Sequence, residues 1–251
     1  MTSDSLNNRK LNLDVCLSPL LIDNFDLKNT IVVVIDIIRA STTICTVLEY
    51  GVSELKPIAD VNSAIALKKE GYIIAGERNG IKLEGFDYDN SPISLMDRSL
   101  AGKKFAITTT NGTKTIAKIS EKLIKFPESE LIVGAYVNYS ILKKYLISQN
   151  KNILLVCSGW KNNISIEDTV FAGQLVSDLL KFKNYEHPTD SANHAKLIYQ
   201  NSDKNLFNFI MDYSMRFKDK IDYLANDIRY CLKFDVVNVI PVLKNGSFIK
   251  Q

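Results

Sequence analysis

The sequence predicts an α/β protein of three layers, α/β/α, built on a largely parallel sheet and ending in a helical C-terminal segment. Short apolar runs alternate with helical patterns through the first two-thirds of the chain, which is the order expected of βαβ units. The run at residues 31–35 is β-branched throughout, as in strands that are buried on both faces. Residues 186–230 then show only a helical pattern.

The first elements follow from local signals. After the strand at 31–35, Ser41 or Thr42 can cap a helix that ends near Gly51. Ser91-Pro92 starts another helix, because serine caps well and proline suits the first helical position. Between them we expect a strand at 54–59, a helix at 62–70, a strand at 72–75 and a polar loop at 77–89.

The later elements continue the alternation and end in a hairpin signal. We expect strands at 103–108, 131–133 and 153–157, each followed by a helix, at 114–119, 139–148 and 166–181. The last apolar segment, 236–242, precedes Asn245-Gly246, a dipeptide that favours a tight β-hairpin turn.

Composition places the chain among ordinary globular proteins. Its 251 residues carry a net charge of +3, with 46% hydrophobic and 24% charged residues, so a disordered chain is not indicated. The length suits one large domain. We divide the chain into an N-terminal extension, residues 1–29, and one domain, residues 30–251, which includes the helical segment.

Charge and hydropathy argue against nucleic-acid and membrane functions. Basic and acidic residues are interspersed, and no long basic run occurs. No apolar run approaches the ~20 residues that cross a bilayer, and the first residues lack a signal-peptide core. We therefore expect a cytoplasmic protein.

Polar residues follow several predicted strands at their carboxyl ends, where parallel sheets bind ligands. In Asp36 to Thr42, a carboxylate suits Mg²⁺, Arg39 suits phosphate oxygens, and Ser41-Thr42 open a helix whose amides favour an anion. This combination points to phosphate-ester chemistry. The alternative is that Asp36 and Arg39 form a structural ion pair while Ser41 only caps the helix.

Three further segments repeat this pattern. Glu77-Arg78 places a second carboxylate and arginine after a strand, and could equally be a solvated charged loop. Thr110-Asn111-Gly112 could hold an anion, or could be ordinary turn chemistry. Ser158-Gly159 ends another strand, and Asp168 in the following helix could bind a metal or only complement the helix dipole.

Several known classes are excluded by absent motifs. The chain has neither a GxGxxG segment nor a Walker A loop. Ile38 occupies the place of the second Asp of the aspartyl-phosphate phosphatases, and Cys157 reads as a buried apolar residue. Its two histidines, His187 and His194, lie away from all of these motifs.

A set of motifs in fixed order resembles a known family. The motifs are VIDIIRASTT at 34–43, GERNG at 76–80, EGFD at 84–87 with NSP at 90–92, TTTNGT at 108–113, CSG at 157–159 with EDT at 167–169, and VIPV at 239–242. With these, the chain resembles the ComB family of 2-phosphosulfolactate phosphatases over about residues 30–243.

The resemblance implies an α/β fold and a Mg²⁺-dependent phosphoric monoester hydrolase. Its reaction would convert (R)-2-phospho-3-sulfolactate to (R)-3-sulfolactate and phosphate, a step of coenzyme M biosynthesis. The chain departs from the family in one place: members commonly have a histidine in the C-terminal helical segment close to the position of Met215, and this chain has none there. A homodimer is expected by analogy only.

The expected site residues follow from the resemblance and the strand ends together. We expect Asp36, Arg39 and Glu77 to be catalytic, and Asp36, Glu77 and Asp168 to contact Mg²⁺. The expected contacts to the small anionic phosphoester substrate are Arg78, Ser41, Thr42, Thr110, Asn111, Gly112, Ser158 and Gly159. The substrate carries about four negative charges, which one Mg²⁺ and two arginines would balance.

Two questions stay open at the level of sequence. The nucleophile could be water or Asp36 through an acyl phosphate, and the missing second Asp favours water. The chain could also hydrolyse another phosphorylated 2-hydroxy acid, or bind small anionic metabolites without turnover.

Overall fold

A computed structural model describes residues 10–182, 185, 188–202, 205–217 and 221–251. One half of its sheet has four parallel strands in the order β1-β8-β2-β7. Their bounds are β1 Leu13–Cys16, β8 Asn152–Cys157, β2 Thr30–Ile35 and β7 Glu130–Gly134. All six residues of β2 are buried, which explains its unbroken apolar run.

The other half of the sheet runs in the opposite direction. It contains the parallel strands β3 Glu54–Pro57, β6 Lys104–Thr108 and β4 Ile73–Arg78, with β5 Ile81–Lys82 antiparallel at the edge. The hairpin of β9 Pro241–Lys244 and β10 Ser247–Lys250 lies between the halves. Because β9 is antiparallel to β7, and β10 to both β9 and β3, the two parallel groups oppose each other.

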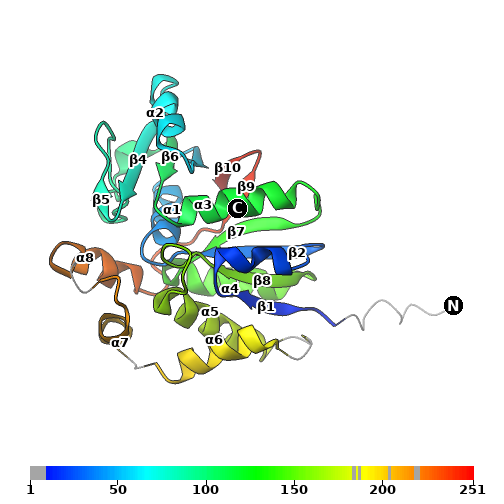
Figure 1. Ribbon diagram of the computed structural model, residues 1–251. Helices are drawn as coiled ribbons and strands as arrows, with labels where there is room; N and C mark the ends of the chain where they lie inside the picture. The colour runs from blue at the N-terminus through cyan, green and yellow to red at the C-terminus, as the bar shows by residue number, and fades with distance from the viewer. Residues whose placement is uncertain (1–9, 183–184, 186–187, 203–204, 218–220) are drawn as a thin grey trace.

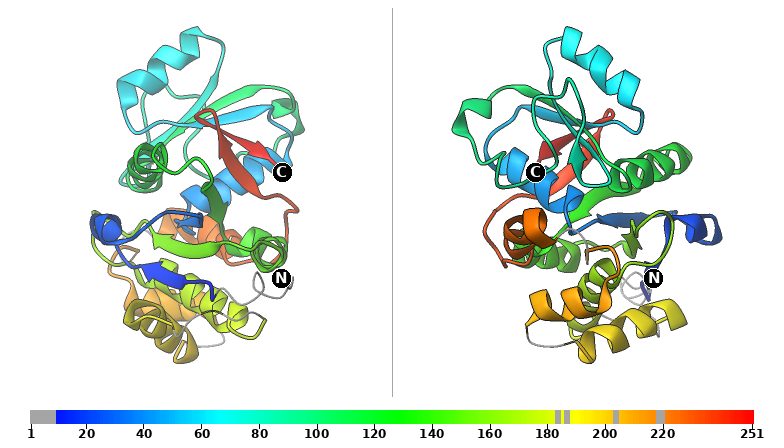
Figure 2. Two further views of the ribbon diagram at one scale, coloured as in Figure 1. Left: turned by 90° about the vertical axis from the view of Figure 1, so that its right-hand side faces the viewer. Right: turned by 60° about the vertical axis from the view of Figure 1, so that its left-hand side comes forward.

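Helices cover both faces, so the expected three-layer α/β/α architecture with a largely parallel sheet is confirmed. Figures 1 and 2 show β4, β5, β6 and α2 in the upper part of the molecule and β1, β2, β7 and β8 in the lower part. α1 and α3 pack against one side of β2 and β7, and α5 packs against β8 from the other. The bounds are α1 Ala40–Glu49, α2 Val61–Lys69, α3 Gly112–Leu123, α4 Tyr139–Ser148 and α5 Ile166–Leu179.

The helical C-terminal segment is also confirmed in its described residues. It contains α6 Asp190–Gln200, α7 Leu206–Tyr213 and α8 Ile221–Cys231. α6 packs tightly on α5, because a Cβ at Gly173 would lie 2.0 Å from the Ala195 carbonyl oxygen. His187 lies outside the described residues.

The expected helix at Ser91-Pro92 is wrong. The chain makes turns there, and a short 3₁₀ helix, η2, covers only Arg98–Leu100. Side-chain oxygens accept the backbone N–H groups there: Asp89 accepts the Ser91 N–H, and the Ser91 hydroxyl accepts the Ser94 N–H. These hydrogen bonds take the place of those that a helix would make.

Two hairpins are built on Asn-Gly turns. Asn245-Gly246 connects β9 and β10 with φ of 50° and 78°, as expected, although the strand begins only at Pro241. Asn79-Gly80 makes a second such turn, with φ of 56° and 86°, inside the segment expected to be a polar loop.

The residues before β2 are partly built into the sheet. β1 pairs with β8, and the 3₁₀ helix η1, Pro19–Asn24, follows it, so this part of the expected extension 1–29 belongs to the folded body. Residues 1–9 lie outside the description. All four cysteines are buried free thiols. In the described part of the chain, no helix is both long and apolar enough to span a membrane.

Candidate active site

Four buried carboxylates meet where the strand ends of the two halves face each other. Asp36 follows β2, Glu77 lies near the end of β4, and Glu167 and Asp168 occupy the first turn of α5. Burial raises the pKa of Asp36, Arg216 lowers it, and Glu77 and Glu167 raise it, so that the pKa of this carboxyl is about 6. Burial, then Glu167 and Asp36, likewise raises the pKa of Asp168.

Arg216 is the cation of this cluster. Its guanidinium donates to Glu167 Oε1 at 3.1 Å. Burial lowers the pKa of Arg216, but Glu167, Asp36, Asp168 and Glu77 together raise it above its ordinary value. One arginine therefore faces four acidic groups. Sequence reasoning missed Arg216 and Glu167, because neither directly follows a strand: Glu167 lies in the first turn of α5 and Arg216 in the turn after α7.

Ser41 and Thr42 fix the backbone that presents Asp36. The Ser41 hydroxyl accepts the Asp36 N–H at 2.8 Å, and the Ser41 N–H donates to the Asp36 carbonyl. The Thr42 hydroxyl donates to the Ile37 carbonyl at 2.8 Å. Both expected substrate-binding residues thus have partners within this loop.

Asp168 connects the ends of β2 and β8. Its Oδ1 accepts the Ile37 N–H at 3.0 Å and its Oδ2 accepts the Gly159 N–H at 3.1 Å. Gly159 is needed there, because its φ is 63° and a Cβ would lie 2.1 Å from the Asn163 carbonyl oxygen. This geometry gives Asp168 a positioning role and does not favour the expected role of metal ligand.

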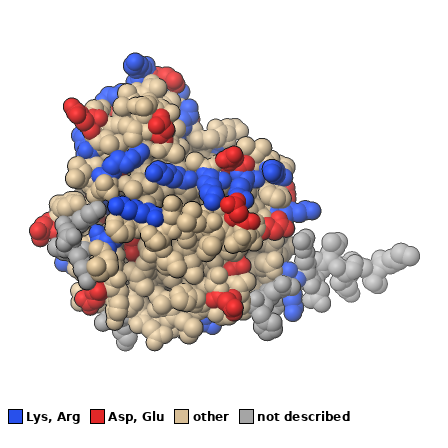
Figure 3. Space-filling model, in the orientation of Figure 1, with Lys and Arg blue, Asp and Glu red and all other residues tan. Residues whose placement is uncertain are grey.

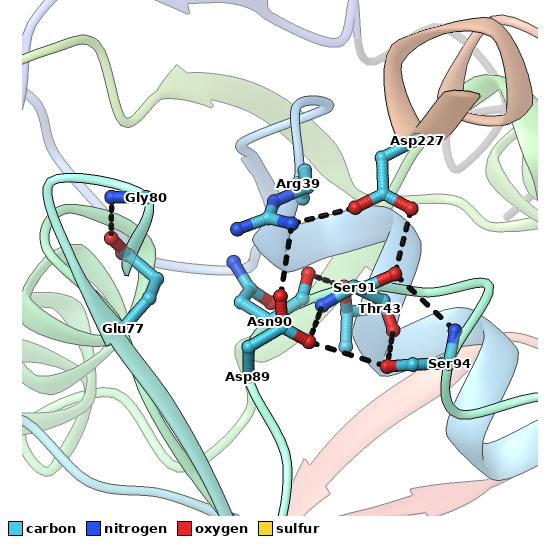
Figure 4. A network of polar contacts seen from close by, with 9 residues as sticks. All are labelled: Arg39, Thr43, Glu77, Gly80, Asp89, Asn90, Ser91, Ser94 and Asp227. Atoms are coloured by element: carbon cyan, nitrogen blue, oxygen red, sulfur yellow. Dashed lines mark hydrogen bonds and ion pairs between the residues drawn. The ribbon is translucent and has the colours of Figure 1, made fainter. Parts of the chain in front are cut away.

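Glu77 and Arg78 hold the end of β4. Glu77 Oε1 accepts the Thr110 N–H at 2.7 Å, and its Oε2 accepts the Gly80 N–H at 2.6 Å (Figure 4). Arg78 donates to the Glu77 carbonyl at 2.7 Å and to the Thr108 hydroxyl at 3.0 Å. Arg78 therefore braces β4 against β6.

Arg39 is anchored by acidic residues other than Asp36. Its Nη1 lies 2.6 Å from Asp227 on α8 and 3.4 Å from Asp89. Asp227 also accepts the Ser91 hydroxyl at 2.7 Å. Figure 4 shows the other terminal nitrogen of Arg39 on the side that faces Glu77, away from both partners. An anchored guanidinium of this kind can still present a donor to an anion.

Asn111 and Gly112 bring the start of α3 against Asp36. A Cβ at Gly112 would lie 2.9 Å from Asp36 Oδ2, so only glycine lets the backbone approach this closely. The Gly112 N–H lowers the pKa of Asp36. Asn111 Oδ1 accepts the Lys161 N–H at 3.0 Å, which ties the loop after β8 to α3.

Buried oxygens without donors mark this region as a ligand site. Asp36 Oδ1, Glu167 Oε2, Asn90 Oδ1 and Ser158 Oγ are buried and have no hydrogen-bond partner within the described residues. Native proteins rarely leave such atoms unpaired. Within that same part of the chain no group of three or more His, Cys, Asp or Glu side chains is arranged to hold a metal. Mg²⁺ often takes only one or two carboxylates plus phosphate and water, which the free oxygens of Asp36 and Glu167 fit.

Three spaces adjoin these groups. The space beside Arg39, Glu77 and Arg216 measures only ≈ 20 Å³. A second, of ≈ 350 Å³, shares Thr110 and Asn111 with it and lies toward the start of α3. A third, of ≈ 290 Å³, is lined by Glu167, His194, Met215 and Arg216 among others. The Met215 side chain is 71% exposed, so Arg216 is the residue of this segment that reaches the carboxylates.

Comparison with known proteins places this site in a family. The family model described as 2-phosphosulpholactate phosphatase matches residues 16–246, which include every residue of the candidate site. The chain belongs to the 2-phosphosulpholactate phosphatase family. It is therefore a phosphatase, a hydrolase of phosphoric monoesters.

Three relatives are each named "Probable 2-phosphosulfolactate phosphatase". The protein of Thermotoga maritima is 37% identical over 86% of this chain and 90% of its own length. That of Caldanaerobacter subterraneus subsp. tengcongensis is 34% identical over 90% of this chain and 92% of its own. The Clostridium botulinum (strain Alaska E43) protein is 31% identical over 96% of this chain and its whole length. The resemblance found in the motifs is confirmed.

Proposed function

We propose that this phosphatase hydrolyses (R)-2-phospho-3-sulfolactate to (R)-3-sulfolactate and phosphate, and that it uses Mg²⁺. The names of the relatives support this choice of substrate. The observation that carries the proposal is Asp36, a buried carboxylate with one free oxygen, at the point where β2, α3, α5 and Arg216 meet. Such a centre suits the binding and charge neutralisation that phosphoryl transfer needs.

Asp36 and Glu167 are the residues that would hold Mg²⁺. Each has a buried oxygen without a partner among the described residues, and Glu167 is close enough to Asp36 to raise the pKa of that carboxyl. When bound, Mg²⁺ supplies positive charge that offsets the phosphate oxygens. Glu77 and Asp168, whose oxygens accept backbone N–H groups, would fix the loops around this centre.

Arg39 and Arg216 would orient the phosphate. The free nitrogen of Arg39 faces the side of Glu77 while Asp227 holds the rest of the group. Arg216 is held by Glu167 and lines the same small space. Fixed donors of this kind stabilise negative charge without rearranging during the reaction.

Two routes for the attack on phosphorus remain distinguishable. In one, water attacks directly and the ester oxygen leaves with a proton. In the other, Asp36 attacks and an acyl phosphate is then hydrolysed. Trapping a labelled phosphoryl group on Asp36 would select the second route, and its absence in a rapid-quench single turnover would select the first.

The test of the proposed function is phosphate release by purified protein with Mg²⁺. The panel contains phosphosulfolactate, 2-phospholactate and the phosphoglycerates. We expect phosphosulfolactate to be the best substrate, and both EDTA and Asp36→Asn to remove turnover. Asp212→Asn, an exposed carboxylate on α7, is the matched control and should keep full activity. Release without Mg²⁺, or no release with any substrate, would contradict the proposal.

A further inference from the structure

The cavity of ≈ 350 Å³ beside the carboxylate centre has a composition unlike that centre. It lies between η1, the first turns of α3 and the loop after β8. Those three segments are held together, because the Ser18 hydroxyl donates to the Asn162 carbonyl and Lys118 donates to the Pro19 carbonyl. Its volume suits a small organic molecule or part of one.

The cavity is lined by cations and, in the described part of the chain, by no acidic side chain. Lys114, Lys118 and Lys161 line it. Neither Lys114 nor Lys161 has a carboxylate partner within 4.0 Å among the described residues, and Lys118 lies 3.4 Å from Asp23 at the rim. Figure 3 shows Lys and Arg side chains gathered in a band across the face that carries α3.

Ser158 adds a buried donor to these cations. Its side chain is 1% exposed, lines the cavity at the end of β8, and its Oγ has no hydrogen-bond partner among the described residues. A hydroxyl in this state is the kind of group that an anionic ligand would satisfy.

The carboxylate centre has no unpartnered arginine to offer to a further acidic group of the substrate. Arg39 is paired with Asp227, Arg216 with Glu167, and Arg78 donates within the sheet. A substrate with several acidic groups would find Mg²⁺ and two already partnered arginines on one side. Lys114 and Lys161, which have no carboxylate partner among the described residues, lie on the other side, across the shared residues Thr110 and Asn111.

We propose that the lysine-lined cavity binds the acidic group of the substrate that lies farthest from the phosphate, which in phosphosulfolactate is the sulfonate. Lys114, Lys118, Lys161 and Ser158 would contact it and so select phosphoesters that carry a remote sulfonate or comparable anion. This inference rests on the proposed function, since it places the remainder of a substrate whose phosphate lies at the carboxylates.

A substrate pair isolates the cavity in an experiment. Phosphosulfolactate and 2-phospholactate differ only in the sulfonate. For Lys114→Gln and for Lys161→Gln, we expect kcat/KM on phosphosulfolactate to fall about tenfold, mainly through KM. We expect 2-phospholactate to change less than about twofold. Lys125→Gln, an exposed lysine beyond α3, is the matched control.

Product binding separates this inference from the function on which it rests. Calorimetric titration with 3-sulfolactate and with lactate needs no turnover, and we expect tight binding of 3-sulfolactate only, weakened by both lysine variants. Equal losses on the two phosphoesters, or sulfolactate binding unchanged in both variants, would overturn the cavity assignment. Lysine-dependent sulfolactate binding in a protein that releases no phosphate would support the cavity and refute the phosphatase reaction.

Discussion

Asp36 combines a fixed backbone with an unsatisfied side chain. Ser41 ties its N–H, Gly112 approaches one of its oxygens, and the other oxygen has no donor among the described residues. Burial raises its pKa to about 6 against 3.8 for an ordinary Asp. The folded protein therefore binds the proton more tightly than the unfolded chain, and this contribution to stability is present below pH 3.8 and lost as pH rises through 6.

We predict that Asp36→Asn stabilises the metal-free protein at pH 7.5 while removing activity. The gain should be about 1–3 kcal/mol, because two pKa units correspond to about 2.7 kcal/mol. It should shrink toward zero below pH 3.8, where Asp36 is protonated in both states. Urea unfolding with EDTA at pH 4.5 and pH 7.5 measures it. An equal gain at the two pH values would assign the effect to packing.

We predict that Gly112→Ala reduces kcat by about 100-fold or more. The new Cβ would lie 2.8 Å from the Ala40 Cβ and 2.9 Å from Asp36 Oδ2, which forces the carboxylate out of position. Gly102→Ala is the control: its φ of 73° makes alanine strained, but nothing lies within 4 Å. The control should lose about 1 kcal/mol of stability and keep its activity. Normal steady-state kinetics in Gly112→Ala would refute the close approach.

Sequence identified residues at strand ends better than residues in helices. Asp36, Glu77 and Gly112 were found because a buried β-branched run or a turn dipeptide marks where a strand stops. The sequence analysis named Asp168 and not the adjacent Glu167, whereas in the described residues both Asp168 oxygens accept backbone N–H groups and Glu167 keeps an oxygen without a partner. Arg216 was missed because no strand precedes it.

At the scale of elements, α8 acts on the site through one side chain. Asp227 holds Arg39 at 2.6 Å and is itself held by the Ser91 hydroxyl. The non-helical segment at residues 89–95, which stands where a helix was expected, contains Asp89 and Ser91, the residues that contact Arg39 and Asp227. Hydrogen bonds from backbone N–H groups to nearby Asp and Ser side chains compete with the hydrogen bonds of a helix. The Ser91-Pro92 pair, which favours a helix start, does not show that this competition occurs.

We predict that Asp227→Asn lowers kcat/KM about tenfold and leaves the fold intact, because an amide keeps the Ser91 contact and weakens the grip on Arg39. Arg39→Lys should cost about 100-fold, since lysine cannot hold Asp227 and present a second donor together. Kinetics with 2-phospholactate and phosphosulfolactate check both variants. Near-normal activity in Arg39→Lys would assign that residue a purely structural role.

At the scale of the molecule, the hairpin β9–β10 joins two opposed half-sheets. Each junction rests on one residue pair in register, Ile132 with Val242 and Leu55 with Phe248. The layers and most strands were predictable from periodicity. The opposed directions were not, because they depend on pairings between residues more than a hundred positions apart, and local pattern contains no information about such pairings.

We predict that Phe248→Ala lowers the free energy of unfolding by about 3–5 kcal/mol. It should also lower kcat at temperatures well below unfolding, although Phe248 is a buried core residue that pairs with Leu55 and is not one of the site residues. The reason is that it fixes the distance between Asp36 and Glu77. Gly246→Ala, in the turn of the same hairpin at φ 78°, should act in the same direction by about 1 kcal/mol. If the Phe248→Ala protein is less stable but keeps its full kcat, the hairpin does not influence catalysis and the prediction is wrong.

The position of this hairpin in the chain also matters while the protein is being made. The ribosome completes both half-sheets, from β1 to β8, before it reaches β9 and β10. A nascent chain thus holds Asp36 and Glu77 on two half-sheets before the hairpin that pairs with both has been made. We expect phosphatase activity to appear only after β9 and β10 have left the ribosomal exit tunnel and paired with β7 and β3.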